Sequence, residues 1–322
     1  MEAVKEVFPG VLVQIEDFGN TNAFRLLAKY RDNTCLFDDD IQGTGAVAVA
    51  GVIASMQITG GNLADQKILF LGAGEAGIGI ADVFVAALKE QGIPEEDARK
   101  KCWFVDSRGL LCAGRDHIAS HKEPYAHEHE YIDNLLDTVK ALKPTALLGL
   151  SGQPQTFTRE VVEAMAEINE QPIIFALSNP TSMAECTAEQ AYTWSEGRAV
   201  FASGSPFDPV KLGDKTFVPG QGNNAYIFPG VGLGVIVSRS RVVTDEMFLA
   251  AAHSLANMVT MSDLERGRVY PPLSDIRQVS AHIAADVATM AYDNGFTDKP
   301  KPEDVLAEVQ AYMYRPIYPH YV

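Results

Sequence analysis

Short apolar runs alternate with longer amphipathic stretches along the chain from about residue 67 onward. The runs are rich in Ile, Leu, Val, Phe and Ala, and several of them end at Gly, Asp or Ser. They cover Lys67–Leu71, Cys102–Val105, Ala146–Leu150, Pro172–Leu177 and Ala199–Ala202. Short apolar runs of this kind are typical of buried strands. Because such strands alternate with helical stretches, the pattern predicts an α/β fold with a doubly wound parallel sheet.

Helical patterns fill the stretches between these runs and continue toward the C-terminus. Thr158 is predicted to be an N-cap, since apolar residues recur after it on one helix face. Further C-terminal helices are predicted at 245–260, 276–293 and 303–314. The region before residue 60 has a different pattern, with a helix of small residues predicted at 43–56. We therefore assign this region to another domain or to a hinge.

A glycine-rich segment follows the first predicted strand and precedes a predicted helix. Residues 72–77 read Gly-Ala-Gly-Glu-Ala-Gly, which is G-x-G-x-x-G. In such a loop the first glycine permits a tight turn, the second lets a pyrophosphate approach the backbone, and the third lets helix and strand pack closely. The helix N-terminus supplies N–H donors for the phosphates. The segment predicts a Rossmann-type dinucleotide site, with a purely structural turn as the alternative.

An acidic residue ends the next predicted strand. Asp106 follows the glycine loop by more than the roughly 20 residues that are usual, because the intervening helix is interrupted near Pro94. We predict that Asp106 lies at the adenine ribose of the dinucleotide. Arg108, Arg115 and Lys122 follow it, and cations here would pair with the 2′-phosphate of NADP. Solvated surface charges are the alternative interpretation.

Composition and charge exclude several classes of partner. The chain has 322 residues, 47% of them hydrophobic, and a formal net charge of −16. Binding of nucleic acid needs a basic face, so we expect no nucleic acid partner. No uninterrupted apolar run approaches the roughly 20 residues of a membrane span, and residues 1–10 show no leader pattern. We therefore expect a soluble chain with no membrane partner. Four cysteines without CxxC spacing favour free thiols in a reducing compartment.

Carboxylates are concentrated ahead of the glycine loop, in two separate segments. Glu16 and Asp17 form one pair, and Asp40 closes a run of three aspartates in the other. Clustered acids repel one another, so a fold that gathers them without a cation is costly. Oxygen ligands with open coordination positions suit Mg²⁺ or Mn²⁺. From the residues alone a solvated acidic loop is the first interpretation, since the spacing does not show that the two segments meet.

Six segments of the chain resemble, in order, the motifs of the malic enzyme family. They are 16–20 (Glu-Asp-Phe-Gly-Asn), 37–44 (Phe-Asp-Asp-Asp-Ile-Gln-Gly-Thr), 71–76 (Leu-Gly-Ala-Gly-Glu-Ala), 176–181 (Ala-Leu-Ser-Asn-Pro-Thr), 201–207 (Phe-Ala-Ser-Gly-Ser-Pro-Phe) and 219–230 (Pro-Gly-Gln-Gly-Asn-Asn-Ala-Tyr-Ile-Phe-Pro-Gly). The likeness is nearest to the NADP-dependent plant and animal enzymes. It implies that residues 1–43 end the family's N-terminal domain and that 44–322 form the NAD(P)-binding domain with its C-terminal helices.

The resemblance implies a role for each residue that matches a motif. Glu16, Asp17 and Asp40 would ligate Mg²⁺ or Mn²⁺. The catalytic set would comprise Asp39, which pairs with the family's catalytic lysine, and the amides that hold the carboxylates of malate, Asn179, Asn223 and Asn224. The dinucleotide contacts would be Asn20, Gly72, Ala73, Gly74, Glu75, Gly77 and Asp106. The contacts to the 2′-phosphate of NADP would be Ser107, Arg108 and Lys122.

The implied reaction is the oxidative decarboxylation of (S)-malate to pyruvate and CO₂ with reduction of NADP⁺. The family's general-base lysine, proton-donating tyrosine and substrate-binding arginine belong to a segment without a counterpart here, so we interpret the chain as a fragment. Two alternatives stay open. One is a non-catalytic dinucleotide-binding or assembly module, and the other is an NAD-linked malic enzyme.

The oligomeric state and the cellular compartment are the last properties that the sequence and the resemblance bear on. We expect a homo-oligomer, either a dimer or a tetramer. Four tyrosines lie close together near the C-terminus, at Tyr312, Tyr314, Tyr318 and Tyr321. Aromatic residues are enriched at protein interfaces, so they favour an oligomer contact, although an ordinary packed tail fits equally well. The cytoplasm is the expected compartment, with a chloroplast or mitochondrion as the alternative. We interpret His127-Glu-His129 as a solvated loop, since no further ligand stands at a zinc-site spacing.

Overall fold

The centre of the molecule is a seven-stranded sheet, mostly parallel. The structure is a computed structural model that describes residues 1–318, except for the side chains of Asn20 and Thr21. The strand order is β11-β8-β7-β6-β3-β4-β5, and β4–β5 is the antiparallel pair. The strands are β3 (Ile68–Leu71), β4 (Cys102–Asp106), β5 (Gly109–Leu110), β6 (Ala146–Gly149), β7 (Ile173–Ala176), β8 (Val200–Ser203) and β11 (Gly220–Gln221). The chain runs outward from β3 in both directions, which places a crevice at the carboxyl ends of β3 and β6.

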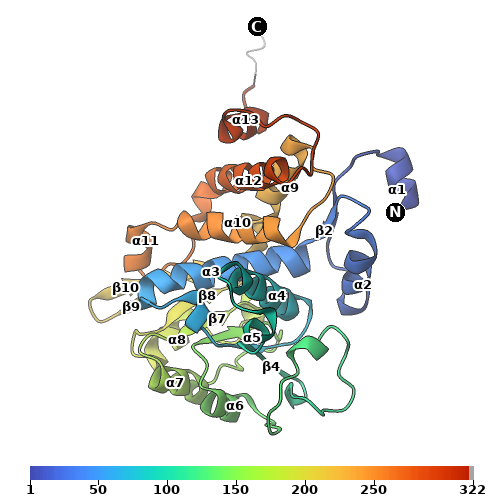
Figure 1. Cartoon of the computed structure of the whole chain (residues 1–322). Helices are drawn as coiled ribbons and strands as arrows, with labels where there is room; N and C mark the ends of the chain where they lie inside the picture. Colours follow the sequence, from blue (N-terminus) through green and yellow to red (C-terminus); the bar gives the residue numbers. More distant parts are fainter. Residues whose placement is uncertain (319–322) are drawn as a thin grey trace.

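Two helical layers cover the sheet, as Figure 1 shows. On the upper side in that view, α3 (Thr44–Thr59) and α4 (Glu75–Glu90) lie next to the sheet, and α10 (Asp245–Asn257), α9 (Phe228–Ser238) and α12 (Ile276–Asp293) lie above them. The opposite side carries α6 (Leu135–Leu142), α7 (Arg159–Ile168) and α8 (Ala188–Trp194). Alternation along β3 divides its side chains between two apolar clusters, because Ile68 and Phe70 join one and Leu69 joins the other. Both faces of the sheet are therefore buried.

Helix α3 forms the middle of the upper layer. The preceding turn and α3 form one continuous helical segment, Asp39–Thr59. Among residues 1–318 it is the one helix whose length and composition alone would allow it to cross a membrane. In its most apolar stretch of 18 residues, 72% is buried inside the protein. The Tyr270 hydroxyl donates to the Val47 carbonyl at 2.9 Å. Helix α3 is therefore a core helix in this structure.

The N-terminal segment packs at one edge of the molecule. It contains α1 (Glu2–Val7), β1 (Val13–Ile15), α2 (Asn20–Tyr30) and β2 (Leu36–Asp38). Strands β1 and β2 pair in parallel apart from the main sheet, and a small apolar cluster lies beneath them. A π-helical turn, η1 (Asp39–Gly43), leads directly into α3. The proposed domain boundary between residues 43 and 44 falls at this junction and stays a prediction.

The structure confirms the predicted fold class and the five predicted strands, and it adds elements that the sequence pattern did not indicate. The Thr158 side chain caps α7 by accepting from Val161 N–H, as predicted. The last predicted helix is shorter than expected, α13 (Val305–Tyr312). Helix α5 (Glu95–Arg99) is the helical stretch predicted to resume after the interruption near Pro94. The unpredicted elements are α1, β1, β2, β5, α6, α8, β11, α9, α11 (Met261–Glu265) and the hairpin of β9 (Val210–Leu212) with β10 (Lys215–Phe217). Most of these are very short or lie at an edge, where periodicity is weakest.

Candidate active site

The first pocket lies at the carboxyl ends of β3, β4 and β6. We call it the glycine-loop pocket, and it is a cavity of about 600 Å³. It is lined by Leu71, Gly72, Ala73, Gly74, Val105, Asp106, Ser107, Ala119, His121, Lys122, Leu150, Ser151, Gln153 and Thr156. Six of the predicted cofactor residues are therefore brought together: Gly72, Ala73, Gly74, Asp106, Ser107 and Lys122. Its position at the switch point of the sheet is where α/β folds bind their ligands.

Glycine is required in the loop for reasons that the structure makes visible. Gly72 has a φ of +115°, and a Cβ there would lie 2.7 Å from the Leu150 carbonyl oxygen. A Cβ on Gly77 would lie 2.5 Å from the Gly72 carbonyl oxygen. Gly77 therefore lets α4 begin close to β3 and does not line the pocket itself. The loop thus delivers the N-terminus of α4 to the pocket, as the fingerprint predicts.

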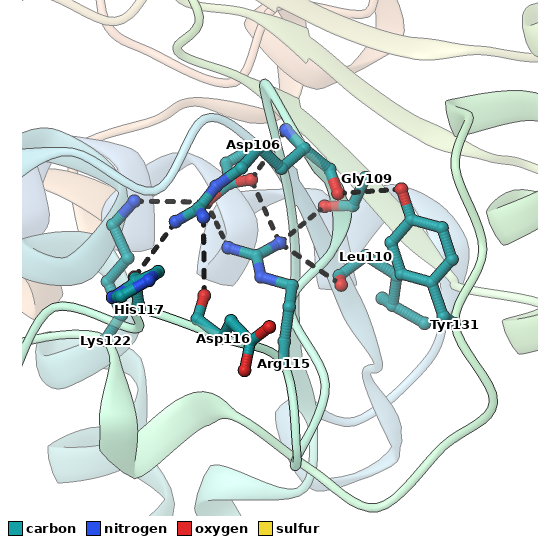
Figure 2. Close-up of polar contacts among 9 residues, drawn as sticks. Asp106, Gly109, Leu110, Arg115, Asp116, His117, Lys122 and Tyr131 are labelled. Carbon is teal, nitrogen blue, oxygen red and sulfur yellow. Dashed lines mark hydrogen bonds and ion pairs between the residues drawn. The ribbon is translucent and has the colours of Figure 1, made fainter.

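Asp106 ends β4 and is surrounded by cations (Figure 2). Arg115 donates to both of its carboxylate oxygens, at 3.0 and 2.7 Å, and Lys122 Nζ donates to Oδ2 at 3.1 Å. The backbone N–H of Arg108 donates to Oδ1 at 2.9 Å. Burial alone would raise the pKa of Asp106, but these hydrogen bonds and the charge of Lys122 outweigh it and lower the pKa to about 2. The carboxylate is neutralised locally by partners within the chain.

Besides Gly77, two predicted cofactor residues, Glu75 and Arg108, do not line the glycine-loop pocket. The Arg108 guanidinium donates to the backbone carbonyls of Asp116 and His117, at 3.3 and 2.9 Å, and the side chain is exposed. Glu75 lines a neighbouring pocket instead of this one. The side chain of Asn20 lies outside the described part of the structure. The structure adds Arg115 as the bidentate partner of Asp106; the sequence indicated only that it was a nearby cation.

The second pocket lies beside the first, and Leu150 lines both. We call it the acid pocket, a cavity of about 460 Å³. Its lining residues are Glu16, Asp17, Asp40, Thr44, Val47, Glu75, Ala76, Leu150, Gly152, Leu177, Ser178, Asn179, Gly222, Asn223 and Asn224. The three predicted metal ligands and three of the four predicted catalytic residues therefore face one cavity. The fourth, Asp39, is buried and contacts it through Asn224.

Two short segments of backbone bring the acids together. The backbone N–H of Asp17 donates to Asp40 Oδ2 at 2.7 Å, which joins the segment after β1 to the turn after β2. Asp17 adopts a φ of +58°, a conformation that is uncommon outside glycine. In the π-helical turn, a Cβ on Gly43 would lie 1.9 Å from Asp39 Oδ1. Gly43 therefore provides the space in which the Asp39 carboxylate lies.

The acid pocket is short of positive charge. No Lys, Arg or His occurs among its described lining residues. Burial, followed by the charges of Glu16, Asp40 and Asp38, raises the pKa of Asp39 to about 8. Burial and nearby carboxylates raise the pKa of Asp38 to about 6 and that of Glu75 to about 7. The pKa of Glu16 is raised as well, first by burial. A cation entering this pocket would relieve that repulsion.

The donor set suits a hard divalent cation, although the carboxylates are not gathered into a ligand cage. Within the described part of the chain, no group of three or more His, Cys, Asp or Glu residues is close enough to hold a metal ion as it stands. Asp38 Oδ2 and Asp39 Oδ1 are buried and have no hydrogen-bond partner among the described residues. Buried carboxylate oxygens without donors are costly. Both oxygens belong to the residues directly before Asp40, so a cation bound in the acid pocket would lower the cost of burying their charge.

The asparagines differ in what their side chains contact. Asn224 Nδ2 donates to Asp39 Oδ2 through a very short hydrogen bond. Asn223 Oδ1 accepts from the backbone N–H of Ala225 at 2.9 Å, and Asn179 lies in the loop after β7. These positions leave amide groups at the pocket wall where a carboxylate could accept from them.

The predicted solvated loop at 127–129 is confirmed for Glu128 and His129, which are exposed, but not for His127, which is half-buried. Its Nε2 lies 2.9 Å from the Arg99 carbonyl and 3.0 Å from that of Cys102, and its ring packs against Trp103. This histidine ties the 127–129 segment to the end of α5 and the start of β4. Its place is structural, and the sequence offered no signal for it.

Comparison with known proteins agrees with this geometry. A family model described as "Malic enzyme, NAD binding domain" matches residues 41–292. The chain belongs to the malic enzyme family. It is 55% identical over 314 residues to the NADP-dependent malic enzyme of Vitis vinifera, covering 97% of this chain and 53% of that protein. It is also 55% identical over 325 residues to the chloroplastic NADP-dependent malic enzyme of Flaveria pringlei, covering 100% of this chain and 50% of the relative. The chain thus spans about half the length of these malic enzymes.

Solved malic enzyme structures share the fold. The enzyme of Pyrococcus horikoshii superposes with a TM-score of 0.75 at 26% identity, over 96% of this chain and 68% of that one. The Entamoeba histolytica enzyme gives a TM-score of 0.77 at 24% identity, over 96% of this chain and 60% of that one. The family resemblance and the Rossmann-type fold predicted from the sequence are therefore confirmed.

Proposed function

We propose that this chain provides the cofactor and metal side of a malic enzyme that oxidises and decarboxylates (S)-malate to pyruvate and CO₂, with reduction of NADP⁺. One observation carries the proposal: acids from two separate segments and three asparagines line a single pocket that shares the Leu150 wall with the glycine-loop pocket. This arrangement would place a small dicarboxylate next to the nicotinamide end of a bound dinucleotide. The relatives that match this chain over about half of their length are named NADP-dependent malic enzymes, which supports the proposal.

The proposed metal ligands are Glu16, Asp17 and Asp40, with Mg²⁺ or Mn²⁺ as the ion. Their oxygen donors and the absence of cations among the described residues of the acid pocket support this assignment. When bound, the ion would polarise the C2 oxygen of malate and stabilise the negative charge that develops as CO₂ leaves. The backbone contact from Asp17 to Asp40 keeps the two acid segments in register.

The asparagines are proposed to bind and orient the substrate. Side-chain amides of Asn179, Asn223 and Asn224 would donate to the carboxylates of malate, which need directional N–H donors rather than more negative charge. Asn224 is already oriented by its bond to Asp39. Asp39 is proposed to hold a cationic general base through its unpartnered Oδ1.

NADP⁺ is proposed as the cofactor in preference to NAD⁺. A free carboxylate at the end of β4 would accept from a ribose 2′-hydroxyl and repel a 2′-phosphate. Here Arg115 and Lys122 already neutralise Asp106, and Lys122 and Ser107 line the same pocket. A doubly charged 2′-phosphate would therefore meet donors and positive charge. An NAD-linked enzyme is the alternative.

Spectrophotometric assay of NADP⁺ reduction tests the proposal directly. An enzyme that contains this chain together with the family's general base, incubated with (S)-malate, NADP⁺ and Mn²⁺, should reduce the dinucleotide, and Asp40→Ala in that enzyme should abolish the metal-dependent rate. Normal turnover by Asp40→Ala would refute the ligand assignment.

A second candidate is dinucleotide binding without catalysis by this chain. It is favoured by one observation, that none of the described residues lining the acid pocket is a lysine, arginine or tyrosine. Deprotonation of the C2 hydroxyl needs a general base within hydrogen-bond reach. NADP⁺ binding without malate turnover would support this candidate, whereas turnover by the chain alone would eliminate it.

Assembly and compartment are also proposals. The tyrosines of the C-terminal segment are 60% exposed at Tyr312, 73% at Tyr314 and 79% at Tyr318, while Tyr321 lies outside the described residues. Exposed aromatics support a homo-oligomer, a dimer or a tetramer, and light scattering would measure its mass. We retain the cytoplasm as a proposed compartment and add weight to the chloroplast, because the relatives from Flaveria pringlei and Flaveria trinervia are named chloroplastic.

A further inference from the structure

Glu185 is a fully buried carboxylate with no assigned role. Its exposure is 0%, and it follows the short helix η4 (Thr181–Met183). Its Oε1 accepts from the Ser178 hydroxyl at 2.5 Å, and from the backbone N–H and hydroxyl of Ser151 at 3.1 and 3.3 Å. Its Oε2 accepts weakly from the Ser178 N–H at 3.4 Å. All these donors are neutral, and within residues 1–318 no cation forms an ion pair with Glu185.

The partners of Glu185 belong to two loops at the carboxyl edge of the sheet. Ser151 follows β6 and lines the glycine-loop pocket, whereas Ser178 follows β7 and lines the acid pocket. The Ser178 hydroxyl also accepts from the Gly152 N–H at 3.0 Å. Glu185 and Ser178 therefore join the loop after β6 to the loop after β7 through a continuous set of hydrogen bonds.

The segment held in this way separates the two pockets. Leu150 lines both of them, Ser151 lines the first and Gly152 lines the second. We call residues 150–152 the partition. The glycine loop packs directly on it, because a Cβ on Gly72 would meet the Leu150 carbonyl oxygen at 2.7 Å. A displacement of the partition would thus alter the dinucleotide loop and the acid pocket together.

Space for the Glu185 side chain is provided by a glycine. A Cβ on Gly149 would lie 2.5 Å from the Glu185 carboxyl carbon. Burying a carboxylate without a cation is expensive, even when several hydrogen bonds offset the loss of water. An apolar side chain could fill the same volume at lower cost. We therefore attribute the buried acid to its two acceptor oxygens, which bind the loop after β6 and the loop after β7 at the same time.

We propose that Glu185 is a positioning residue that holds the partition between the cofactor and substrate pockets, so that both pockets depend on one buried carboxylate. The inference rests on the proposed function for the identity of the two ligands. The hydrogen bonds that connect the two loops are independent of that function. Glutamine at this position keeps the shape and offers one acceptor oxygen, while its NH₂ group faces a donor. Aspartate keeps both acceptors but is one methylene shorter.

The test combines amide hydrogen exchange with NADP⁺ binding in the full chain. In Glu185→Gln, we expect faster exchange at the Ser151, Gly152 and Ser178 amides together and about tenfold weaker NADP⁺ binding by calorimetry. Glu185→Asp should recover most of the affinity, because it retains the charge and both oxygens. A matched control is Ser195→Ala, which removes a fully buried hydroxyl bonded to Ala191 and lies outside both pockets. It should leave NADP⁺ affinity and exchange at the partition unchanged.

The outcomes separate this inference from the proposed function. If the wild-type chain binds neither NADP⁺ nor NAD⁺, the proposed cofactor fails, while the exchange measurement still decides the role of Glu185. Unchanged exchange at the three amides, or faster exchange in only one loop, would overturn the inference. Should Glu185→Gln fail to fold, Ser178→Ala removes a donor to Glu185 and the acceptor of Gly152 N–H, and it should accelerate exchange in both loops. Unaltered exchange at Ser151 and Gly152 in Ser178→Ala would overturn the inference equally.

Discussion

Two carboxylate sites lie side by side at the carboxyl edge of the sheet, and they have opposite electrostatic surroundings. Asp106 is held by Arg115 and Lys122, and its pKa is lowered to about 2. In the acid pocket no described lining residue is cationic, and the pKa of Asp39 is raised to about 8. An aspartate therefore has two cationic partners at the first site, whereas the described lining of the second site offers none.

The difference indicates which ligand each site can receive. Around Asp106 the chain supplies its own counter-charges, so the site can accept an additional phosphate without a metal. The acid pocket can become neutral only by binding protons or a cation from outside the chain. The first site should therefore be sensitive to loss of a basic side chain, and the second to metal and pH.

Removing Arg115 should give the largest effect on stability. Its side chain and that of Asp106 are 9% and 10% exposed, so Arg115→Ala leaves a nearly buried carboxylate with Lys122 as its remaining side-chain cation. Breaking such a pair costs about 3 kcal/mol, which urea unfolding would measure as a lower midpoint. Arg159→Ala breaks an exposed pair with Glu163 and should change nothing measurable. Equal effects of the two substitutions would show that the Asp106 network contributes no special stability.

Loss of a proposed metal ligand should be nearly as large. Asp40→Asn removes one charged oxygen and should weaken Mn²⁺ binding about 100-fold, or roughly 2.7 kcal/mol, in a calorimetric titration of the chain. Glu96→Gln removes an acid whose side chain is 84% exposed and is the matched control. Comparable Mn²⁺ affinities for the two variants would remove the distinction between the acid pocket and ordinary surface acids.

Without metal, the stability of the protein should fall as the pH rises through the acid pocket's titration range. The unfolded pKa of an aspartate is about 3.9, whereas that of Asp39 in the folded protein is about 8. The folded state thus binds more protons between these values, and this contribution to stability is complete below pH ~4 and lost as pH rises through ~8. We expect wild type to lose at least about 2 kcal/mol more than Asp39→Asn between pH 5 and 8. Parallel pH profiles of thermal unfolding for the two proteins would contradict the raised pKa.

The smallest expected effect concerns the affinity of the Asp106 site for NADP⁺. Lys122→Gln removes a pocket-lining cation but leaves Arg115 on Asp106. NADP⁺ affinity should fall about tenfold, or roughly 1.4 kcal/mol, while NAD⁺ affinity stays the same, and fluorescence titration would measure both. Lys100→Gln, at an exposed pair with Glu96, serves as the control. Equal losses for both dinucleotides would argue against recognition of the 2′-phosphate.

The sequence was sufficient for the strands, the glycine loop and the family, because each depends on local periodicity or on contiguous motifs. It could not show that Asp17 meets Asp40, since that contact joins two turns through one backbone N–H. Nor could it distinguish Arg108, which turns toward two carbonyls, from Arg115, which clamps Asp106. The sequence does not single out Glu185 either, because a lone acid in a loop resembles a solvated residue, and only the structure shows the two loops that it bridges.

Anomalous diffraction from crystals of the chain grown with Mn²⁺ tests the central claim most directly. The account predicts one strong peak in the acid pocket, about 2.0 to 2.3 Å from carboxylate oxygens of Glu16, Asp17 and Asp40, and the carboxylates drawn closer together than in the metal-free chain. A peak elsewhere, or an ion bound by only one of the two acid segments, would contradict it.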